Sequence, residues 1–451
     1  MKKPNGMRIA LVLVAMATAV ASTAANAPGS PAFGTSSTKA SGEQPDQVLE
    51  WNRIFVETLI GTNTPNSASP RLGAIVHASI FDAYNGIERR YMPLFVQSID
   101  GNGERLVSQG ASRRAAVVAA AYTALVALFP ARQQLLSDSY AASLAALSDD
   151  GGDGGKSRER GIAWGTQVAK AILASRANDG FSASYPPFAG GTAVGQWRPV
   201  PPATAMSAQP LAFTAPFVVE SNTQFRPAPP RTFATATYAE DINAVKALGR
   251  RTGSTRTDAQ TELAPFWEGN ASVHWNQAAN QIARANDLSM SDSSRLFAVL
   301  NLAMADTVFT IWSAKRYYGA DALAVTWRPQ TAITLADTDG DANTTPDPDW
   351  LPLITTPSHS EYPAGHPALN GAAATVLLSH FADAQTFTLT TSGLPSNSYA
   401  SISQARADGN SARIWGGMHY PSTVALSNTV GGTIADYVDA NAMQLLRGRR
   451  D

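Results

Sequence analysis

Apolar residues recur at helical spacing along almost the whole of this 451-residue chain. Val48, Trp51, Phe55 and Leu59 share one helical face, and residues 115–129 are apolar nearly all round, as in a buried helix. No segment shows a notable alternation of apolar and polar residues, the pattern of a half-buried strand. The sequence therefore predicts an all-α fold, a large helical domain of the bundle type with few or no strands.

Prolines and turn residues divide the chain into separate helices. Further helices are expected at residues 131–147, 159–178, 237–249, 258–286, 291–315, 367–382, 400–415 and 423–446. Residues 182–232 carry ten prolines, so no helix is expected there. Trp197, Phe213, Phe217 and Phe225 favour burial, so this stretch is predicted to be a long ordered loop that serves a function or wraps the fold.

Composition excludes several classes of protein. The 34 basic and 35 acidic residues give a net charge of −1, which argues against a nucleic-acid binder. The chain has no cysteine, which excludes disulfides, thiolate catalysis, iron–sulfur ligation and cysteine-bound zinc. Imidazole chemistry must come from six histidines: His77, His274, His359, His366, His380 and His419.

The N-terminus predicts a secretory signal peptide over residues 1–27. Three basic residues precede an apolar run over residues 9–21, and small-residue triplets at 19–21 and 25–27 are candidate cleavage sites. Pro28 would hinder cleavage after the second triplet, which favours the first. The run is shorter than the ~20 residues of a membrane span, although an uncleaved anchor is the alternative.

The mature protein is therefore expected to be secreted or periplasmic, with no membrane attachment after signal cleavage. Residues 28–46 are rich in small and polar residues and predict a flexible lead-in. Residues 47–450 are expected to form the helical domain, with the chemical motifs between residues 315 and 423.

A first chemical motif pairs Lys315, at the end of the helix expected at 291–315, with Arg328 in the segment Trp327-Arg328-Pro329. By itself, a lysine at this place is usually structural, because it favours the helix dipole and keeps its ammonium group in water.

The second motif is the segment from Glu361 to Pro367, which contains Ala364, Gly365 and His366. Gly365 allows a close approach to the backbone, and Pro367 suits the first position of a helix. His366 would then lie at a helix N-terminus, whose free N–H groups favour an oxyanion. An ordinary helix-capping turn is the alternative.

The third motif places Arg413 and His419 six residues apart, at the end of a helix that closes on Gly416 and Gly417. A packed helix end with a core histidine would give the same pattern.

In this order, the three motifs resemble the signature of the vanadium-dependent haloperoxidase and type 2 phosphatidic acid phosphatase superfamily. That signature is Lys-x6-Arg-Pro, then Pro-Ser-Gly-His, then Ser-Arg-x5-His-x3-Asp, and the Arg413-x5-His419 spacing matches it fully. Four segments are similar to the bacterial haloperoxidase-like branch in particular: residues 77–85, 196–199, 224–227 and 327–333. The resemblance covers roughly residues 45–445 and implies an α-helical fold built around four-helix bundles.

The resemblance also implies a site for vanadate or phosphate. The groups implied to hold the oxygens of this ligand are Lys315, Arg328, Arg413 and the N–H of Gly365. His419 would be the covalent vanadium ligand, or the phosphoryl acceptor of a phosphatase. His366 would be the general acid–base.

The function implied first is an exported haloperoxidase that uses vanadate and hydrogen peroxide to oxidise a halide to hypohalous acid. A soluble secreted acid phosphatase, which acts on a phosphate ester without a metal, is the alternative. A non-catalytic relative that binds an oxyanion is a second alternative. Members of this family are often oligomeric, so a homo-oligomer is also among the expectations.

The chain departs from the signature at four places. Lys315 lies thirteen residues before Arg328, so residues 316–326 would have to be an insertion that loops out and returns, and Arg316 could replace Lys315 as a cation. Ala364 stands where a serine is usual, and Ala412 precedes Arg413 in place of serine. Thr423 replaces the final aspartate, so another group, such as a backbone carbonyl, is expected to orient His419.

Three further features have weaker predictions. Asp306, on the helix of Lys315, could partner one of the site arginines, and His359 could line the site and tune the choice of halide. An acidic loop lacks the glycine position and closing glutamate of a calcium loop, so it is expected to be solvated. Its carboxylates are Asp337, Asp339, Asp341 and Asp347.

Overall fold

The computed structural model describes residues 46–147, 153 and 155–446. Within these residues the fold is helical, and the one sheet among them is a hairpin of two three-residue strands. This confirms the expected all-α class with few strands. The signal peptide predicted for residues 1–27 lies outside the described residues, as does all but the last residue of the lead-in at 28–46. The limits of the helical domain, 47–450, stay a prediction.

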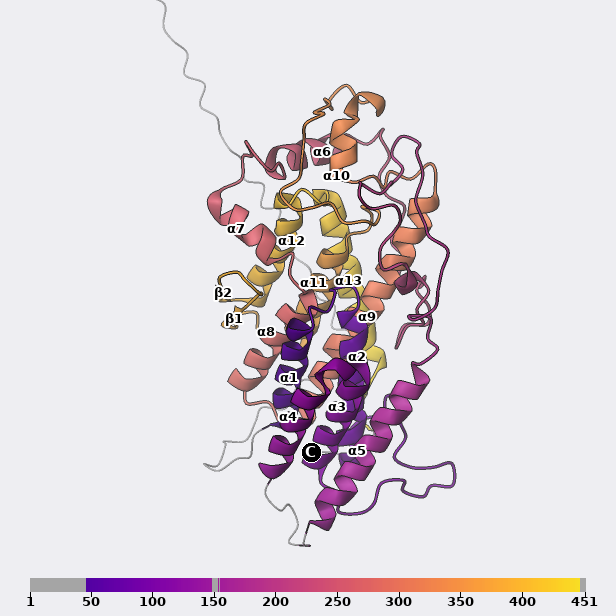
Figure 1. Ribbon diagram of the computed structural model, residues 1–451, viewed down its shortest axis with the longest axis vertical. Helices are drawn as coiled ribbons and strands as arrows, with labels where there is room; N and C mark the ends of the chain where they lie inside the picture. The colour runs from indigo at the N-terminus through magenta and orange to yellow at the C-terminus, as the bar shows by residue number, and fades with distance from the viewer. Residues whose placement is uncertain (1–45, 148–152, 154, 447–451) are drawn as a thin grey trace, which may run out of the picture.

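Most of the described elements are α-helices (Figure 1). They are α1 (Gln47–Gly61), α2 (Ser69–Glu88), α3 (Arg113–Leu128), η1 (Pro130–Arg132), α4 (Gln133–Ala145), α5 (Lys156–Ser175), η2 (Gln209–Ala212), α6 (Ala236–Leu248), α7 (Asp258–Phe266), α8 (Ala271–Ala285), α9 (Met290–Ala320), α10 (Pro329–Thr334), η3 (Ala336–Thr338), α11 (Gly365–His380), β1 (Phe387–Leu389), β2 (Asn397–Tyr399), α12 (Ile402–Trp415) and α13 (Pro421–Asn441).

Two groups of helices share α9, which is buried along nearly all of its length. On the N-terminal side α9 packs against α2, which in turn packs against α3 and α5. On the C-terminal side α9 packs against α11 and α13, and α12 packs against α11. The molecule in Figure 1 is accordingly elongated, with α1–α5 towards one end and α6, α7 and α10 towards the other. Side chains from both groups of helices can thus meet beside α9.

Small residues allow the N-terminal helices to approach closely. The buried residues of α3 are almost all alanine or valine, and α5 meets α3 at Gly161 and Gly165. A Cβ atom on Gly165 would lie 2.1 Å from the backbone oxygen of Ala116, which no side chain permits. The tight packing of α3 against α5 therefore depends on this glycine.

The proline-rich stretch at 182–232 has no α-helix, as expected, and contains only the short η2. Asp306 in the middle of α9 anchors it, because its carboxylate accepts the N–H groups of Phe217, Val218 and Val219 at 2.6–3.0 Å. The prediction that Asp306 partners a site arginine is therefore wrong. Trp197 and Phe217 are buried as predicted, whereas Phe213 is 46% exposed.

The helix expected at 258–286 is in fact two helices, α7 and α8. Pro265 lies in the last turn of α7, and the Asn270 side chain caps α8 by accepting the N–H groups of Ser272 and Val273. The break between these helices exposes Glu268 to the interior cavity described below. The sequence predicted one continuous helix here because the apolar periodicity hardly changes across the break.

The acidic loop is occupied by protein contacts. Asp339 accepts hydrogen bonds from Tyr238 and Thr344, and Asp347 pairs with Arg250. In the part of the chain that the structure describes, α9 is the only single helix long and apolar enough to cross a membrane, and its apolar window lies wholly inside the protein. Helices α3 and α4 would meet the same test only as a pair bent by 118°.

Candidate active site

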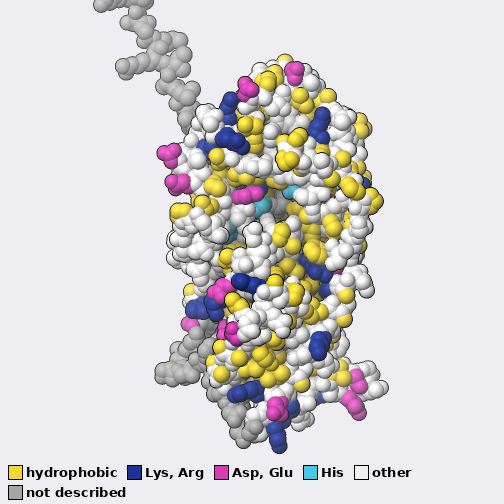
Figure 2. Space-filling view, in the orientation of Figure 1, with side chains coloured by type: hydrophobic (Ala, Val, Ile, Leu, Met, Phe, Trp, Pro, Cys, Tyr) yellow, Lys and Arg dark blue, Asp and Glu magenta, His cyan; other side chains and the backbone are white. Residues whose placement is uncertain are grey.

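A cavity of about 590 Å³ lies where the loop between α1 and α2, the middle of α9 and the N-terminus of α11 meet. Its lining includes three of the six histidines, together with Glu268 and Arg413. Figure 2 shows histidine side chains gathered at a hollow in the middle of the molecule, beside an acidic side chain. The cavity thus joins the second and third sequence motifs.

A tight turn after α12 brings Arg413 and His419 together. Arg413 lies in the last turn of α12, and its carbonyl accepts the N–H groups of Met418 and His419 at 3.0 and 3.3 Å. Gly417 has φ +77°, and a Cβ atom there would lie 2.7 Å from the carbonyl oxygen of Gly249. Only glycine suits this position, so the Gly-Gly pair noted in the sequence sets the geometry of the third motif.

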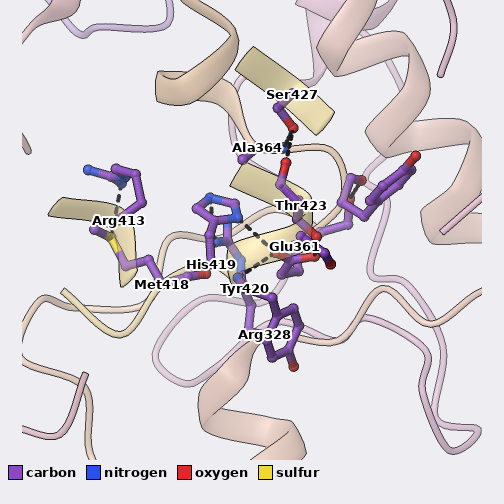
Figure 3. A network of polar contacts seen from close by, with 12 residues as sticks. Arg328, Glu361, Ala364, Arg413, Met418, His419, Tyr420, Thr423 and Ser427 are labelled. Carbon is purple, nitrogen blue, oxygen red and sulfur yellow. Dashed lines mark hydrogen bonds and ion pairs between the residues drawn. The ribbon is translucent and has the colours of Figure 1, made fainter. Parts of the chain in front are cut away.

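His419 is held by groups on both ring nitrogens (Figure 3). Its Nδ1 lies 3.1 Å from a carboxylate oxygen of Glu361, and its Nε2 lies 3.1 Å from Nη1 of Arg328. Because a guanidinium only donates, Nε2 must accept, and the ring proton lies on Nδ1 facing Glu361. Burial, followed by the charges of Arg328 and Lys315, keeps the pKa of His419 well below its usual value. The imidazole is therefore neutral, with its Nε2 lone pair directed into the site.

Glu361 supplies the orienting carboxylate, so the backbone carbonyl expected in that role is not the partner. Its side chain also accepts the N–H of Tyr420 at 3.1 Å and the hydroxyl of Thr423 at 3.1 Å. Thr423, which replaces the usual aspartate, thus donates to a carboxylate that reaches it from the second motif (Figure 3). Burial raises the pKa of Glu361, and Arg231 leads the charges that oppose this.

The insertion between Lys315 and Arg328 is partly helical. Helix α9 continues to Ala320, and the chain then turns back so that Arg328 is the N-cap residue of α10, with Pro329 following. Sequence reasoning expected the insertion to loop out and return, and it does so after one more helical turn. Arg316 does not replace Lys315, because its guanidinium stacks on Phe188 at 4.0 Å and lines a different cavity.

Lys315 and Arg328 hold the loop that carries Glu361. The buried ammonium of Lys315 donates to the carbonyls of Ser360 at 2.6 Å and Glu361 at 3.2 Å. Arg328 donates to the carbonyls of His359 and Met418, each at 2.8 Å. Burial lowers the pKa of Lys315 well below its usual value and that of Arg328 to about 9. Both groups lie behind the lining of the cavity, which includes neither of them, and both already have protein partners.

Arg413 pairs with Glu268, which sequence reasoning missed. The Nη2 atom of Arg413 lies 3.0 Å from the sulfur of Met418, and its buried Nε has no partner among the described residues. Burial would raise the pKa of Glu268, but Arg413 and His366 lower it overall. Pro265 and Gly269, which flank the helix break, were the signal that could have placed Glu268 in a loop.

The N-terminus of α11 opens on the cavity without a capping side chain. The helix begins at Gly365, two residues before the expected Pro367, and the N-cap residue is Ala364. The N–H of Ala364 donates to the hydroxyl of Ser427 at 2.8 Å. The first N–H groups of the helix are therefore available to an anion at Gly365, which lines the cavity.

His366 follows Gly365 and faces the cavity. Its Nε2 lies 3.0 Å from the amide nitrogen of Asn66, whose amide oxygen accepts the N–H of Ala271 at 3.0 Å. This second bond sets the orientation of the amide, so an N–H of Asn66 faces Nε2, which also lies 3.3 Å from the carbonyl oxygen of Gly269. Burial and the charge of Arg413 lower the pKa of His366 to about 4. His366 is therefore a neutral imidazole at the cavity, held at Nε2 by Asn66 and Gly269.

His359 lies in the cavity wall, as expected. Its ring packs 5.1 Å from that of Trp312, and its Nδ1 accepts from Arg328 at 2.8 Å. The cavity and the groups behind its wall therefore bring together three basic side chains, two carboxylates and three neutral imidazoles, a set that suits an anionic ligand.

Comparisons with known proteins concern the family and the fold. Residues 295–448 match the family model described as VCPO second helical-bundle domain. The solved structure titled as the first bacterial vanadium-dependent iodoperoxidase matches with a TM-score of 0.74 and 22% identity, covering 91% of this chain and 100% of that one.

An apo-type bacterial vanadium-dependent chloroperoxidase matches with a TM-score of 0.63 and 18% identity, over 83% of this chain and 94% of that chain. A holo-type structure gives a TM-score of 0.61 and 16% identity, over 90% and 95%. No curated protein matches the chain significantly. The family-model match supports the superfamily that the sequence motifs resemble, and at these identities the structural likeness shows the fold.

Proposed function

The chain has the fold of the vanadium haloperoxidase superfamily, and on that premise we propose that it is an exported haloperoxidase that uses vanadate. The observation that carries the proposal is the arrangement around His419. A neutral imidazole has its lone pair on Nε2, which faces the guanidinium of Arg328, while a carboxylate holds the opposite nitrogen.

The residues present fit vanadate. Nε2 of His419 suits the metal, the unpartnered Nε of Arg413 suits an oxygen, and the uncapped start of α11 offers the N–H of Gly365. Lys315 and Arg328 would supply the remaining positive charge. Arg328 would first have to release Nε2 of His419, because its guanidinium now occupies that lone pair.

Bound vanadate would supply a Lewis acid that polarises hydrogen peroxide for attack by a halide. The chain's own groups have separate tasks. Glu361 keeps the proton of His419 on Nδ1, so that the lone pair stays on Nε2. His366 is neutral and faces the cavity, so it can accept a proton there and return it. Glu268 offsets the charge of Arg413, and the neutral His359 lies in the wall along which a halide would approach.

The test is a measurement of halide oxidation by the purified protein with and without orthovanadate. Bromination of a dye by hydrogen peroxide and bromide should require vanadate and should be absent in His419→Ala. The same assay with chloride and iodide would establish the preferred halide.

Two other outcomes would overturn the proposal. Hydrolysis of p-nitrophenyl phosphate by the vanadate-free protein, inhibited by vanadate, would identify a phosphatase in its place. Vanadate binding without either activity would identify a non-catalytic oxyanion-binding relative.

Export is a separate part of the proposal and depends on residues 1–27, which lie outside the described residues. Mass spectrometry of the protein recovered from the periplasm or the medium should find it shortened, with an N-terminus after Ala21. A full-length N-terminus on the recovered protein would contradict this.

A further inference from the structure

A second cavity, of about 540 Å³, lies along α9 and shares no lining residue with the candidate active site. Its wall is formed by α9 together with η2 and the proline-rich loop. The loop contributes Arg226, from one of the segments similar to the bacterial haloperoxidase branch, and α9 contributes Arg316. The proposed reaction uses neither arginine.

Both guanidinium groups are held on aromatic rings. The Cζ atom of Arg226 lies 4.1 Å from the centre of the Tyr317 ring, and that of Arg316 lies 4.0 Å from the centre of the Phe188 ring. The Tyr318 hydroxyl also donates to the carbonyl of Pro227 at 2.7 Å, which ties the loop beside Arg226 to α9. Stacking and this anchor reduce the freedom that either arginine would lose on binding a ligand.

Neither arginine has an anionic partner. Among the described residues, no carboxylate lies within ion-pair distance of Arg226 or Arg316, and the Nε atom of each is buried without a hydrogen bond. Asp321 lines the same cavity, but its carboxylate accepts the N–H of Leu323 at 2.9 Å. The cavity therefore keeps two unpaired positive charges against one acidic group.

The same cavity exposes aromatic surface. Phe213 is 46% exposed and stacks on Tyr185 with the ring centres 4.4 Å apart, while Tyr317 is 54% exposed. Exposed rings beside two guanidinium groups match a ligand that has one flat apolar end and one anionic end. A carboxylate suits the fork of an arginine because it accepts two parallel N–H bonds.

We propose that this cavity binds a small aromatic carboxylate, with its carboxylate between Arg226 and Arg316 and its ring against Phe213 and Tyr317. The proposal is independent of the halide chemistry, because it concerns binding to the protein alone and a different set of residues.

The experiment is a calorimetric or NMR titration of the full-length protein with benzoate, with benzamide as the neutral isostere. Benzoate should bind at least about tenfold more tightly than benzamide, because charge-assisted hydrogen bonds are stronger than neutral ones. The double variant Arg226→Ala/Arg316→Ala should lose this preference. Replacing both arginines by lysine should restore part of it, since the charge returns without the planar fork.

The matched control is Arg53→Ala, which removes an exposed arginine of α1 that pairs with Glu57. It should bind benzoate like the parent protein, and thermal denaturation should confirm that all variants remain folded. Equal affinity for benzoate and benzamide, or full benzoate affinity in the double alanine variant, would overturn the proposal. The second result would place benzoate at another cationic site, such as the candidate active site.

Discussion

Glu361 and His419 are 58 residues apart in the chain and meet at 3.1 Å, where the carboxylate of one accepts the Nδ1 proton of the other. The signature that the sequence resembles has an aspartate four residues after this histidine, and here that position is Thr423. The carboxylate that orients His419 therefore comes from the second motif, and Thr423 donates a hydrogen bond to it.

Replacing Glu361 with glutamine should impair vanadate binding, because an amide no longer favours the Nδ1–H tautomer of His419. Loss of such a partner typically weakens metal affinity or activity by ~10–100-fold. Vanadate titration and the bromination rate both measure the effect. Adding Thr423→Asp to Glu361→Gln should recover part of the loss, since it restores a carboxylate at the usual position. A Glu361→Gln protein with parental affinity would show that Glu361 does not control His419.

Arg413→Ala should abolish tight vanadate binding. The arginine is 1% exposed, and it would contribute its charge and the unpartnered Nε to a vanadate oxygen. Vanadate titration of Arg413→Ala beside Arg53→Ala separates this effect from a general loss of positive charge. Parental affinity in Arg413→Ala would remove it from the proposed vanadate site.

Lys315→Ala should weaken oxyanion binding less than Arg328→Ala does, because Arg328 reaches Nε2 of His419 whereas Lys315 bonds to the carbonyls of Ser360 and Glu361. Its loss should instead lower the melting temperature, since two buried carbonyls lose their donor. Parallel vanadate titrations and thermal denaturation of the two variants test this. A larger loss of affinity in Lys315→Ala would mean that the lysine is the main oxyanion contact.

His366→Ala should still bind vanadate but turn over about 10²–10⁴-fold more slowly, the usual value of general acid–base help. In the parent protein, the pKa of about 4 predicts that His366 stays an active base down to pH 4. Asn66→Ala removes the donor to Nε2 and with it a bond that favours the neutral ring. The acid limb of its kcat/KM profile should therefore move upwards, but only slightly, because burial and the charge of Arg413 still lower the pKa of His366. An unchanged profile would show that Asn66 does not hold His366 in solution.

His77 should make the fold sensitive to acid. Its ring lies buried between Phe55 and Phe297, and neither ring nitrogen has a hydrogen-bond partner among the residues that the structure describes. Burial lowers the pKa of His77 to about 3. The unfolded chain binds a proton near pH 6.5 and the folded chain does not, so His77 makes stability fall as the pH drops from about 6.5 to 3. His77→Leu should reduce that slope by at most about 1.4 kcal/mol per pH unit. Denaturant unfolding at several pH values measures it, and an unchanged slope would contradict the argument.

The sequence by itself determined the helical class, because the helical spacing of apolar residues can be recognised within one short segment. Each such segment contains the whole buried face of one helix. It also determined most helix limits, the loop at 182–232 and the three motifs, since prolines, glycines and caps act within a few residues. His366, His419, Lys315, Arg328 and Arg413 could be named because their spacing resembles a known signature.

Only the tertiary structure decided which groups meet. Glu361 reaches His419, and Glu268 reaches Arg413, across 58 and 145 residues of chain. Asp306, expected near a site arginine, instead holds the N–H groups of a loop nearly ninety residues away. Arg316 follows Lys315 directly, yet its side chain lines the other cavity. A helix turns its side chains by about 100° per residue, so neighbours in sequence face different surroundings, and packing alone decides what those surroundings contain.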